Sequence, residues 1–418
     1  MTITSQTQLP LETSASPRSA WAVDPTITFL NHGSYGICPR AVMEYQSDLR
    51  ERMERDPARF FKVDLERLMD GVRRRLGAFM NCPPQDLAPC PNATVAIATI
   101  LHNTPFKAGD EVLLTDHEYS SGTNELGRLA PRLGIKVVTA KVPFPISSPD
   151  QVTQSVLAAI TPRTRLVIVS HITSATSLIF PVEPIVAECN ARGIDILVDG
   201  AHAPGQIPVD IAALKPTYYV GSFHKWLCSP KGTGLMYVRP DKQDGFRTVV
   251  LSSRADKIRP DRSLFLRDFD YMGTADYTGI LSVPAAIDAV ASLIDGGWPA
   301  VMRHNHRLIV EARKAVCDIT GLTPPAPESM LGSMASLILP QPDAEFTGRP
   351  AIYDDALQDA LIDRYKIQIP VWPFGNPPNN LRLLRLSAQL YNSLDQYRRL
   401  GEALNKELAA ERSLRRTG

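Results

Sequence analysis

The stretch Ile194-Asp-Ile-Leu-Val-Asp-Gly-Ala-His-Ala-Pro-Gly205 decides the fold class of this chain. Its first half is a nearly continuous apolar run that ends in Asp199, and small residues follow at once. Such a run is typical of a strand that is buried on both faces of a parallel sheet. Ligands of open parallel sheets bind at the carboxyl ends of the strands, where Asp199 would project. Taken alone, Asp199 would be interpreted first as a helix N-cap.

Similar short apolar runs lie on both sides of this stretch and alternate with amphipathic stretches of helical length. We expect strands at Glu111–Thr115, Lys136–Thr139, Arg165–Ser170, Ile194–Asp199, Thr217–Gly221 and Leu235–Val238. Apolar residues recur every three to four positions over 42–53 and 65–79, which predicts helices there. The alternation predicts an α/β domain with a mainly parallel sheet that helices cover.

The pattern changes after about residue 280. Helical periodicity over 280–294 and 302–317 precedes the Pro-rich linker Thr323–Pro327, and strands are expected at Ser333–Leu339, Lys366–Pro370 and Leu381–Leu386. These elements predict a second, smaller α+β domain. The expected division is a loose N-terminal tail (1–20), a large domain (39–285) and a small domain made of 21–38 with 286–418.

The composition excludes several classes of protein. Lys and Arg total 45 and Asp and Glu total 44, so the net charge of +1 gives no general attraction to nucleic acid or an anionic membrane. No apolar run approaches the roughly 18 residues of a membrane helix. The six cysteines form no C-x-x-C pair and give no support for a metal site, and the first twenty residues do not resemble a signal peptide. We expect a cytoplasmic protein with reduced thiols.

A lysine follows another predicted strand end, 26 residues after Asp199. Lys225 stands in Ser222-Phe-His-Lys-Trp226, and a lysine that is partly desolvated beside a Trp can serve as an amine nucleophile. A lone lysine would be read as solvated surface. Pyridoxal phosphate, however, needs a lysine for its Schiff base and an acid at its pyridine nitrogen, so the pair is informative.

The cofactor also needs a phosphate site, and Pro91-Asn-Ala-Thr-Val-Ala-Ile-Ala98 offers one. Small residues and a hydroxyl open an apolar helix there, so backbone N–H groups and the helix dipole would face an anion. Any capped helix looks similar, so this signal is weak by itself. No dinucleotide-binding or P-loop fingerprint occurs in the chain.

These motifs, in this order, resemble the class V aminotransferase family of pyridoxal-phosphate enzymes, which includes cysteine desulfurases, and within it the isopenicillin N epimerase-like branch. The resemblance runs from Phe29-Leu-Asn-His-Gly-Ser-Tyr-Gly36 to Arg385-Leu-Ser-Ala-Gln-Leu-Tyr-Asn392. It implies the aspartate-aminotransferase-like fold of type I, with a large sheet domain and a smaller α+β domain. It also implies a homodimer with a shared active site.

The resemblance assigns roles to individual residues. Lys225 would form the Schiff base, Asp199 would pair with the pyridinium nitrogen, and His117 would stack on the cofactor ring. Further cofactor contacts are expected from Ala93, Thr94, Ser222 and His224 at the phosphate, His202 at the phenolic oxygen, Ser174 near the ring, and Thr274 from the neighbouring subunit. Taken alone, His117 and His202 could be ordinary buried histidines.

The substrate side of the pocket is expected to contain Asn31, His32 and Gly33. Arg385 would pair with the substrate carboxylate, which suits the planar fork of its guanidinium. The alternative for Arg385 is an ion pair on the face of a strand.

The resemblance leaves the reaction open. Lys225, once displaced by the substrate amine, would act as a base at Cα. Reprotonation from the other face, with His117 as a possible donor, gives epimerisation, whereas loss of a β-substituent gives a lyase. A desulfurase would need a cysteine in the loop before Arg385, and residues 367–382 contain none.

We therefore expect an epimerase-like enzyme that acts at Cα of an amino acid or small peptide with a free carboxylate. The alternatives are a C–S lyase of the ergothioneine type, a desulfurase-like enzyme, and a non-catalytic relative that serves as a binding module. Transamination is not separated from these by any motif, and the side chain that is recognised cannot be read from the sequence.

Overall fold

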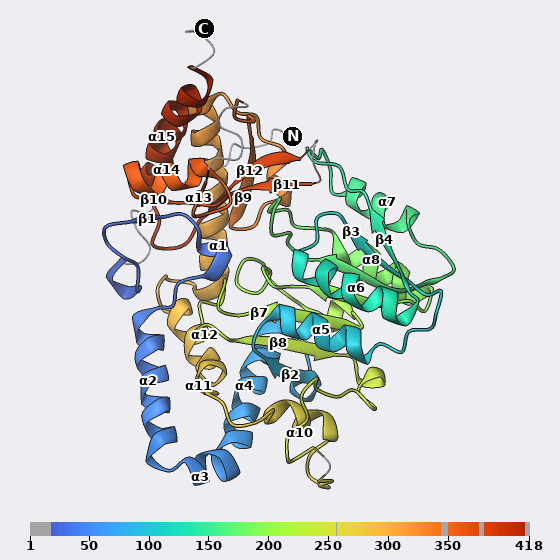
Figure 1. The fold of residues 1–418 in the computed structure, drawn as a ribbon. Coiled ribbons are helices and arrows are strands. Elements are labelled where there is room, and N and C mark those ends of the chain that lie inside the picture. Colours follow the sequence, from blue (N-terminus) through green and yellow to red (C-terminus); the bar gives the residue numbers. More distant parts are fainter. Residues whose placement is uncertain (1–17, 256, 344–349, 376–379, 414–418) are drawn as a thin grey trace, which may run out of the picture.

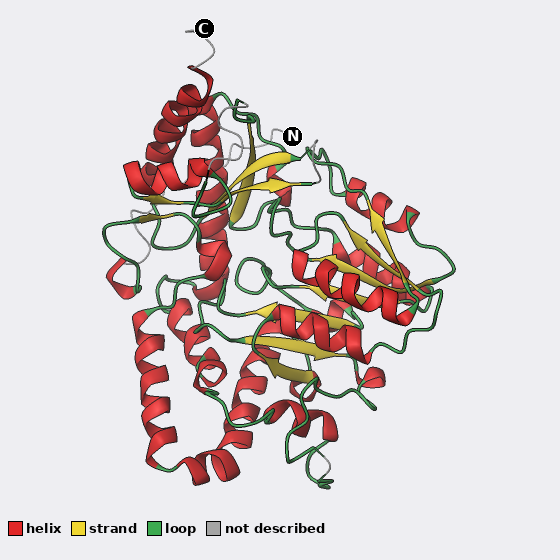
Figure 2. Cartoon of the chain, in the orientation of Figure 1, coloured by secondary structure: helices red, strands yellow, loops and turns green. Residues whose placement is uncertain are grey.

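The computed structural model describes residues 18–255, 257–343, 350–375 and 380–413. Residues 1–17 of the expected tail lie outside this range, and Arg18–Ala20 form a single 3-10 turn. Two regions of sheet structure lie one above the other in Figure 1, and Figure 2 shows helices around each of them. No helix among the described residues is long and apolar enough to cross a membrane.

The larger region is a seven-stranded sheet with the strand order β2-β8-β7-β6-β5-β3-β4. The strands are β2 (Leu87–Cys90), β3 (Glu111–Thr115), β4 (Lys136–Ala140), β5 (Thr164–Ser170), β6 (Asp195–Asp199), β7 (Tyr218–Ser222) and β8 (Gly234–Val238). β4, β3, β5, β6 and β7 pair in parallel, and β8 runs antiparallel to both of its neighbours. The predicted mainly parallel sheet is therefore confirmed.

Every residue of β6 is buried because helices cover both faces of the sheet. Leu197 belongs to one apolar cluster, with α5 (Ala93–Asn103) and α6 (Ser120–Leu133). Ile196 and Val198 belong to the other, with α7 (Asp150–Ala158) and α8 (Val182–Ala191). Alternate residues of a strand point to opposite faces, which explains why the run is apolar throughout.

The helices outside the sheet differ in one place from the sequence prediction. The expected helix over 280–294 is two helices, α11 (Thr278–Leu281) and α12 (Val283–Ala291). Pro284 lacks the N–H that a continuous helix would need, and it lies in the first turn of α12, where proline is favoured. The other helices of this region are α1 (His32–Tyr35), α2 (Arg40–Arg55), α3 (Pro57–Arg59), α4 (Leu65–Met80), α9 (Ile211–Leu214) and α10 (Leu264–Asp270).

The smaller region combines the C-terminal third with the N-terminal segment. It contains α13 (Gly297–Thr320), α14 (Ala356–Tyr365), α15 (Leu394–Ser413) and the antiparallel sheet β11 (Val371–Phe374), β12 (Leu381–Ser387) and β9 (Met334–Leu339). β1 (Thr28–Phe29) pairs in parallel with β10 (Ile367–Gln368), so the start of the described chain is attached to its end.

The two apolar cores meet along α13. Trp298 and Val301 pack in the core of the large sheet, whereas Leu308 and Ile309 pack in the core of the small domain. Val283, Ile287 and Val290 of α12 also pack in the core of the large sheet. We therefore propose that the domain division falls inside α13, between Val301 and Leu308, and not at residue 285 as expected.

Candidate active site

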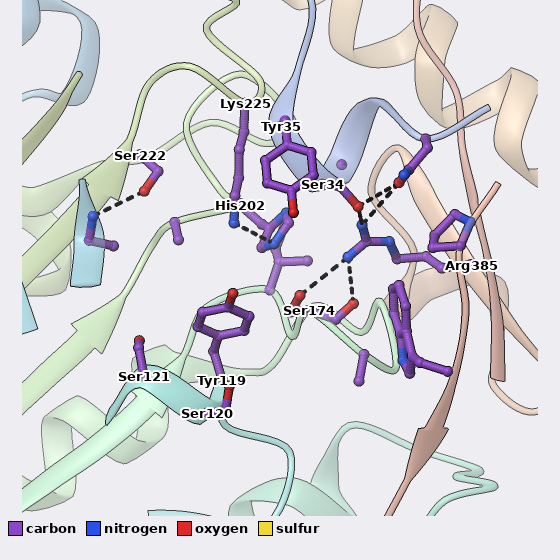
Figure 3. A pocket seen from close by; sticks show the side chains of 18 of the residues that line it. Ser34, Tyr35, Tyr119, Ser120, Ser121, Ser174, His202, Ser222, Lys225 and Arg385 are labelled. Carbon is purple, nitrogen blue, oxygen red and sulfur yellow. Dashed lines mark hydrogen bonds between the residues drawn. The ribbon is translucent and has the colours of Figure 1, made fainter. Parts of the chain in front are cut away.

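A cavity of about 660 Å³ lies where the carboxyl ends of the parallel strands meet the small domain (Figure 3). Most of the predicted site residues line it: Asn31, Gly33, Ala93, Thr94, His117, Ser174, Asp199, His202, Ser222, His224, Lys225 and Arg385. They come from separate loops and strand ends, so the fold brings together residues that are far apart in the sequence. His32 and Thr274 are not among the residues that line the cavity.

Asp199 is the last residue of β6 and faces the cavity. One carboxylate oxygen accepts a hydrogen bond of 2.9 Å from the N–H of Ala201, in the turn that follows the strand. Burial raises the pKa of Asp199, and this hydrogen bond and the nearby Lys225 oppose the change. The alternative role as the N-cap of a regular helix does not apply, because a turn follows and not a helix.

Lys225 follows β7 in a turn and points into the cavity, toward His202 (Figure 3). Its Nζ lies 2.9 Å from Nε2 of His202 and 5.8 Å from the centre of the Tyr119 ring. Burial lowers the pKa of Lys225 to about 8; Asp199 opposes this change and Arg385 adds to it. About a tenth of this amine is therefore uncharged at pH 7, compared with less than about a thousandth for an ordinary lysine.

The N-terminus of α5 lines another part of the cavity and is a candidate site for an anion. Asn92 caps this helix, its Oδ1 accepting from the N–H of Val95 at 3.0 Å, and the N–H of Ala93 donates to Oγ of Ser222 at 3.1 Å. Nδ1 of His224 is buried and has no hydrogen-bond partner among the described residues. Helix N–H groups, a hydroxyl and an unpartnered imidazole nitrogen are the groups that a phosphate requires.

Arg385 lies on β12 and is only 1% exposed, yet neutral groups surround it. Nη1 donates to the carbonyl and the hydroxyl of Ser174, at 2.9 and 3.2 Å, and Nη2 donates to Oγ of Ser34 at 2.7 Å. Nε has no partner among the described residues. The guanidinium lies 4.8 Å from the centre of the Trp372 ring.

Burial lowers the pKa of Arg385 to about 10. None of its hydrogen bonds goes to a carboxylate, so the alternative of an ion pair on the strand face finds no support in the described residues. A buried guanidinium without a counter-ion is costly unless a ligand supplies one. The site therefore suits a ligand carboxylate, which the guanidinium fork can bind with two hydrogen bonds.

His117 was expected to stack on the cofactor ring. Its Nε2–H donates to the carbonyl of Val142 at 3.1 Å, and its Nδ1 accepts from Oγ1 of Thr176 at 2.8 Å. Its ring, 2% exposed, packs against the rings of Phe144, Phe180 and Phe374. Both ring nitrogens therefore have hydrogen-bond partners within the protein, although His117 still lines part of the cavity.

Tyr119, two residues after His117, also has an aromatic ring that could stack on a ligand ring. Its ring is 51% exposed, lines the cavity and lies on the side opposite Lys225 in Figure 3. The expected contact of His117 with a ligand ring stays a prediction, and the exposed ring of Tyr119 is a second candidate for that contact. The motif Asp116-His-Glu-Tyr119 contained both candidates, but only the path of the backbone after β3 distinguishes them.

His32, which was expected on the substrate side, and Thr274, which was expected to serve a neighbouring subunit, both lie outside the cavity of this chain. His32 is fully buried beneath the cavity, where its Nε2–H donates to the carbonyl of Lys225 at 2.9 Å and its Nδ1 accepts from the hydroxyl of Tyr391 at 2.8 Å. It supports the lysine from behind and does not line the substrate side. Thr274 is exposed and contacts the hydroxyl of Tyr271 at 2.9 Å, so its role in a neighbouring subunit stays a prediction.

Glu118 is a half-buried acid in the cavity wall that the sequence did not single out. Its carboxylate accepts from the hydroxyl of Ser170 at 2.6 Å and from the hydroxyl of Thr115 at 2.8 Å. Burial raises the pKa of Glu118 to about 7, and the neighbouring Asp199 adds to the increase. Ser34, Tyr35 and Trp372 were missed as well, although Ser34 and Tyr35 stand inside the motif that carried Asn31 and Gly33.

Comparisons with known proteins agree with this geometry. The sequence profile of the family described as Aminotransferase class-V matches residues 39–346. The chain is 35% identical to an isopenicillin N epimerase of Amycolatopsis lactamdurans (94% of this chain, 98% of the relative) and 31% identical to that of Streptomyces clavuligerus (93% and 96%). A probable chloroplastic L-cysteine desulfhydrase of Arabidopsis thaliana is 26% identical (91% and 83%).

Solved structures share the fold at low sequence identity. The cystine C–S lyase C-DES in complex with cysteine persulfide has a TM-score of 0.76 at 20% identity and covers 93% of this chain and 98% of its own. A cysteine desulfurase of Thermococcus onnurineus NA1 has a TM-score of 0.75 at 16% identity (94% and 97%). The anion site at α5, the buried Asp199 and the amine of Lys225 fit the phosphate, the ring nitrogen and the aldehyde of one cofactor. This chain therefore belongs to the class V aminotransferase family, has the type I fold, and its cofactor is pyridoxal 5'-phosphate.

Proposed function

We propose that this protein removes and returns the proton at Cα of an amino acid or small peptide with a free carboxylate, in the manner of an isopenicillin N epimerase. The observation that carries the proposal is Arg385, a buried guanidinium with only neutral partners that shares one cavity with Lys225. The two epimerases at 31% and 35% identity support inversion over other outcomes at Cα.

Pyridoxal phosphate, when bound, supplies an aldehyde that condenses with the substrate amine and a ring that withdraws electrons from Cα. The residues of the chain bind and orient the substrate and the cofactor. Arg385 would hold the carboxylate through its two outer nitrogens and its unpartnered Nε. Asp199 would accept a hydrogen bond from the ring nitrogen and keep its proton in place.

Lys225 would take the proton from Cα, because its pKa of about 8 leaves about a tenth of the amine uncharged at pH 7 and half of it at pH 8. Inversion also needs a donor on the opposite side of Cα. The phenol of Tyr119 lines the cavity across from the amine, whereas both ring nitrogens of His117 are occupied. We therefore assign the second proton to Tyr119.

A second candidate is a C–S lyase that expels a β-sulfur substituent after the same proton removal. L-cysteine desulfhydrases of Arabidopsis and rice at 26–28% identity over 90–92% of this chain favour it, and the same base would serve. A desulfurase would need a nucleophilic thiol, but no cysteine is among the residues that line the cavity, and all six cysteines are buried elsewhere.

The test is incubation of the holoenzyme in deuterated water with a panel of L- and D-amino acids and short peptides. Deuterium at Cα together with both configurations supports epimerisation. Release of pyruvate and sulfide from cysteine supports the lyase instead. If neither product forms with any member of the panel, the proposed substrate class is wrong. Lys225→Ala, incubated in parallel, should form neither product.

We also propose that the active form is a homodimer in which Thr274 reaches the phosphate of the neighbouring subunit. Thr274 is exposed and lies outside the cavity of its own chain, which leaves its hydroxyl accessible to a second copy. Light scattering should give a mass of twice 46.0 kDa. Thr274→Val should weaken cofactor retention about tenfold, the loss of one hydrogen bond to a charged group. A monomeric holoenzyme would refute this assignment.

A further inference from the structure

A chain of three side chains runs from the cavity into the protein. Nζ of Lys225 lies 2.9 Å from Nε2 of His202, and the indole Nε1–H of Trp226 donates to Nδ1 of the same imidazole at 3.3 Å. Trp226 and His202 are 1% and 3% exposed, so water does not compete for these contacts. The backbone of His202 is held as well, because its carbonyl accepts from Nε2 of Gln206 at 2.8 Å.

The indole determines which nitrogen of His202 carries the proton. An indole N–H only donates, so Nδ1 must present a lone pair. Burial lowers the pKa of His202 well below its usual value, and the charge of Lys225 adds to this, so the imidazole is neutral. A neutral imidazole carries one proton, which must therefore be on Nε2. That N–H points at the amine of Lys225.

We propose that Trp226 is a positioning residue that holds His202 in its Nε2–H tautomer, so that His202 offers the amine of Lys225 a donor and not an acceptor. The proposal rests on the proposed role of Lys225 as the base. An uncharged amine has a lone pair that accepts this hydrogen bond, whereas an ammonium group has none. To accommodate an ammonium, the His202 proton would have to move to Nδ1 and break the contact with Trp226.

Some of the other groups near the Lys225 amine favour its charged form, and others favour its uncharged form. Asp199 favours the charged form of Lys225, whereas Arg385 and burial favour the uncharged form. His224 lies nearby, and burial lowers its pKa to about 4, so it adds no charge near neutral pH. The ring of Tyr119 faces the amine at 5.8 Å. The fixed tautomer of His202 therefore acts with Arg385 against the charge that Asp199 favours.

The tautomer can be read directly in the wild-type, full-length chain before pyridoxal phosphate is added, where the amine of Lys225 is free to contact His202. The chain has eight histidines, and labelling them with 15N allows NMR to distinguish Nε2–H, Nδ1–H and doubly protonated rings, with His202→Gln identifying the signal of His202. We expect the Nε2–H form above pH 8, where most of the Lys225 amine is uncharged. An Nδ1–H ring or an imidazolium at that pH would overturn the proposal. This readout is independent of the reaction, so it stands even if the proposed substrate class fails.

The effect on Lys225 can be read with Trp226→Phe, which keeps an aromatic ring and removes the donor. The readout is the pH midpoint for uptake of pyridoxal phosphate by the full-length, cofactor-free chain, followed by visible absorbance. We expect the midpoint to rise by about one unit, a tenfold loss of the uncharged amine below it, because one hydrogen bond no longer favours that form.

The matched control is Trp298→Phe. Trp298 is also buried, and its indole N–H donates to the carbonyl of Ile287 at 2.9 Å, within the large-domain core. Its midpoint should equal that of the wild type. Equal midpoints in all three proteins, or the same rise in both variants, would overturn the proposal. If Trp226→Phe does not fold, the wild-type NMR measurement decides alone.

Discussion

Two arginines on strand β12, three residues apart, are almost equally buried and have opposite surroundings. Arg382, 4% exposed, makes bidentate contacts with the carboxylates of Asp355 and Glu411. Arg385, 1% exposed, has hydrogen-bond partners among the described residues only in the neutral groups of Ser174, Ser34 and Asn31. The hydrogen bonds to Asp355 and Glu411 raise the pKa of Arg382 against the effect of burial, whereas burial lowers that of Arg385.

This difference in partners distinguishes Arg382, whose charge stabilises the fold, from Arg385, whose charge is available to a ligand. An odd spacing places the two side chains on opposite faces of the strand. On one face of β12, Arg382 forms ion pairs with Asp355, at the start of α14, and with Glu411 of α15. On the other face, Arg385 lines the cavity. A guanidinium whose charge the protein neutralises holds the fold, whereas one whose charge it leaves open is ready for an anion.

The largest expected effect is on the structural side. Arg382→Met should lower the free energy of unfolding by about 3–5 kcal/mol, because it leaves two mostly buried carboxylates without a partner. Chemical denaturation measures this change. The kcat/KM of the fraction that remains folded should stay near the wild-type value. A loss of kcat/KM without a loss of stability would mean that the two arginines do not differ as described.

Arg385→Met should lower kcat/KM and leave the stability of the fold unchanged or higher. Substrate binding in the transition state should weaken by about 2–5 kcal/mol, which is roughly 30-fold to several thousandfold in kcat/KM, because the carboxylate loses its buried partner. The melting temperature should stay the same or rise, since a buried charge without a counter-ion has been removed. A strongly destabilised Arg385→Met would show that this guanidinium holds the fold after all.

The pH dependence of the reaction rate should follow the titration of Lys225 in the cavity and not that of the ion pairs of Arg382. Lys225 must be uncharged to act as a base, and its pKa is about 8. The rate of Cα–H exchange should therefore fall about tenfold per pH unit as the pH drops below 8 and level off above it. The denaturation midpoint should not follow this profile. A rate that is flat between pH 6 and 8 would exclude Lys225 as the titrating base.

The smallest expected effect concerns the hydrogen bond that the neutral hydroxyl of Ser34 accepts from Arg385. Ser34→Ala removes the 2.7 Å hydrogen bond to Nη2, so the guanidinium should be less well oriented and KM should rise about five- to tenfold, with kcat little changed. Ser393→Ala is a suitable control, because Ser393 is exposed and lies outside the cavity. Equal KM values for the two variants would mean that Ser34 does not orient the guanidinium.

The sequence predicted the centre of the fold well. The run that ends in Asp199 is apolar throughout because both faces of β6 are covered, and that pattern is visible without a structure. β2 and β11 were not predicted, since each is four residues long and contains a proline, Pro89 or Pro373. Both lie at the edge of their sheets, where a proline is tolerated. The break before α12 was signalled by Pro284, but the apolar periodicity outweighed it.

The site was predicted less completely, for a physical reason. The segment Leu381-Arg-Leu-Leu-Arg-Leu-Ser387 gives no sign of which arginine has ionic partners, because Asp355 and Glu411 lie 27 and 29 residues away in the chain. His117 and Tyr119 stand in a connection, where side chains do not alternate regularly. Their orientation depends on contacts such as that of His117 with Val142, which only the folded chain makes.

The pairing of β1 with β10 has a consequence for synthesis. Asn31 and Arg385 meet in the cavity although 354 residues separate them, and β1 has no strand to pair with until residues 367–368 have been made. All seven strands of the large sheet precede that point, so this domain can begin to fold while the ribosome is still translating the small one. A nascent chain would therefore acquire the lysine and the anion site early, and the carboxylate site only with its last strands.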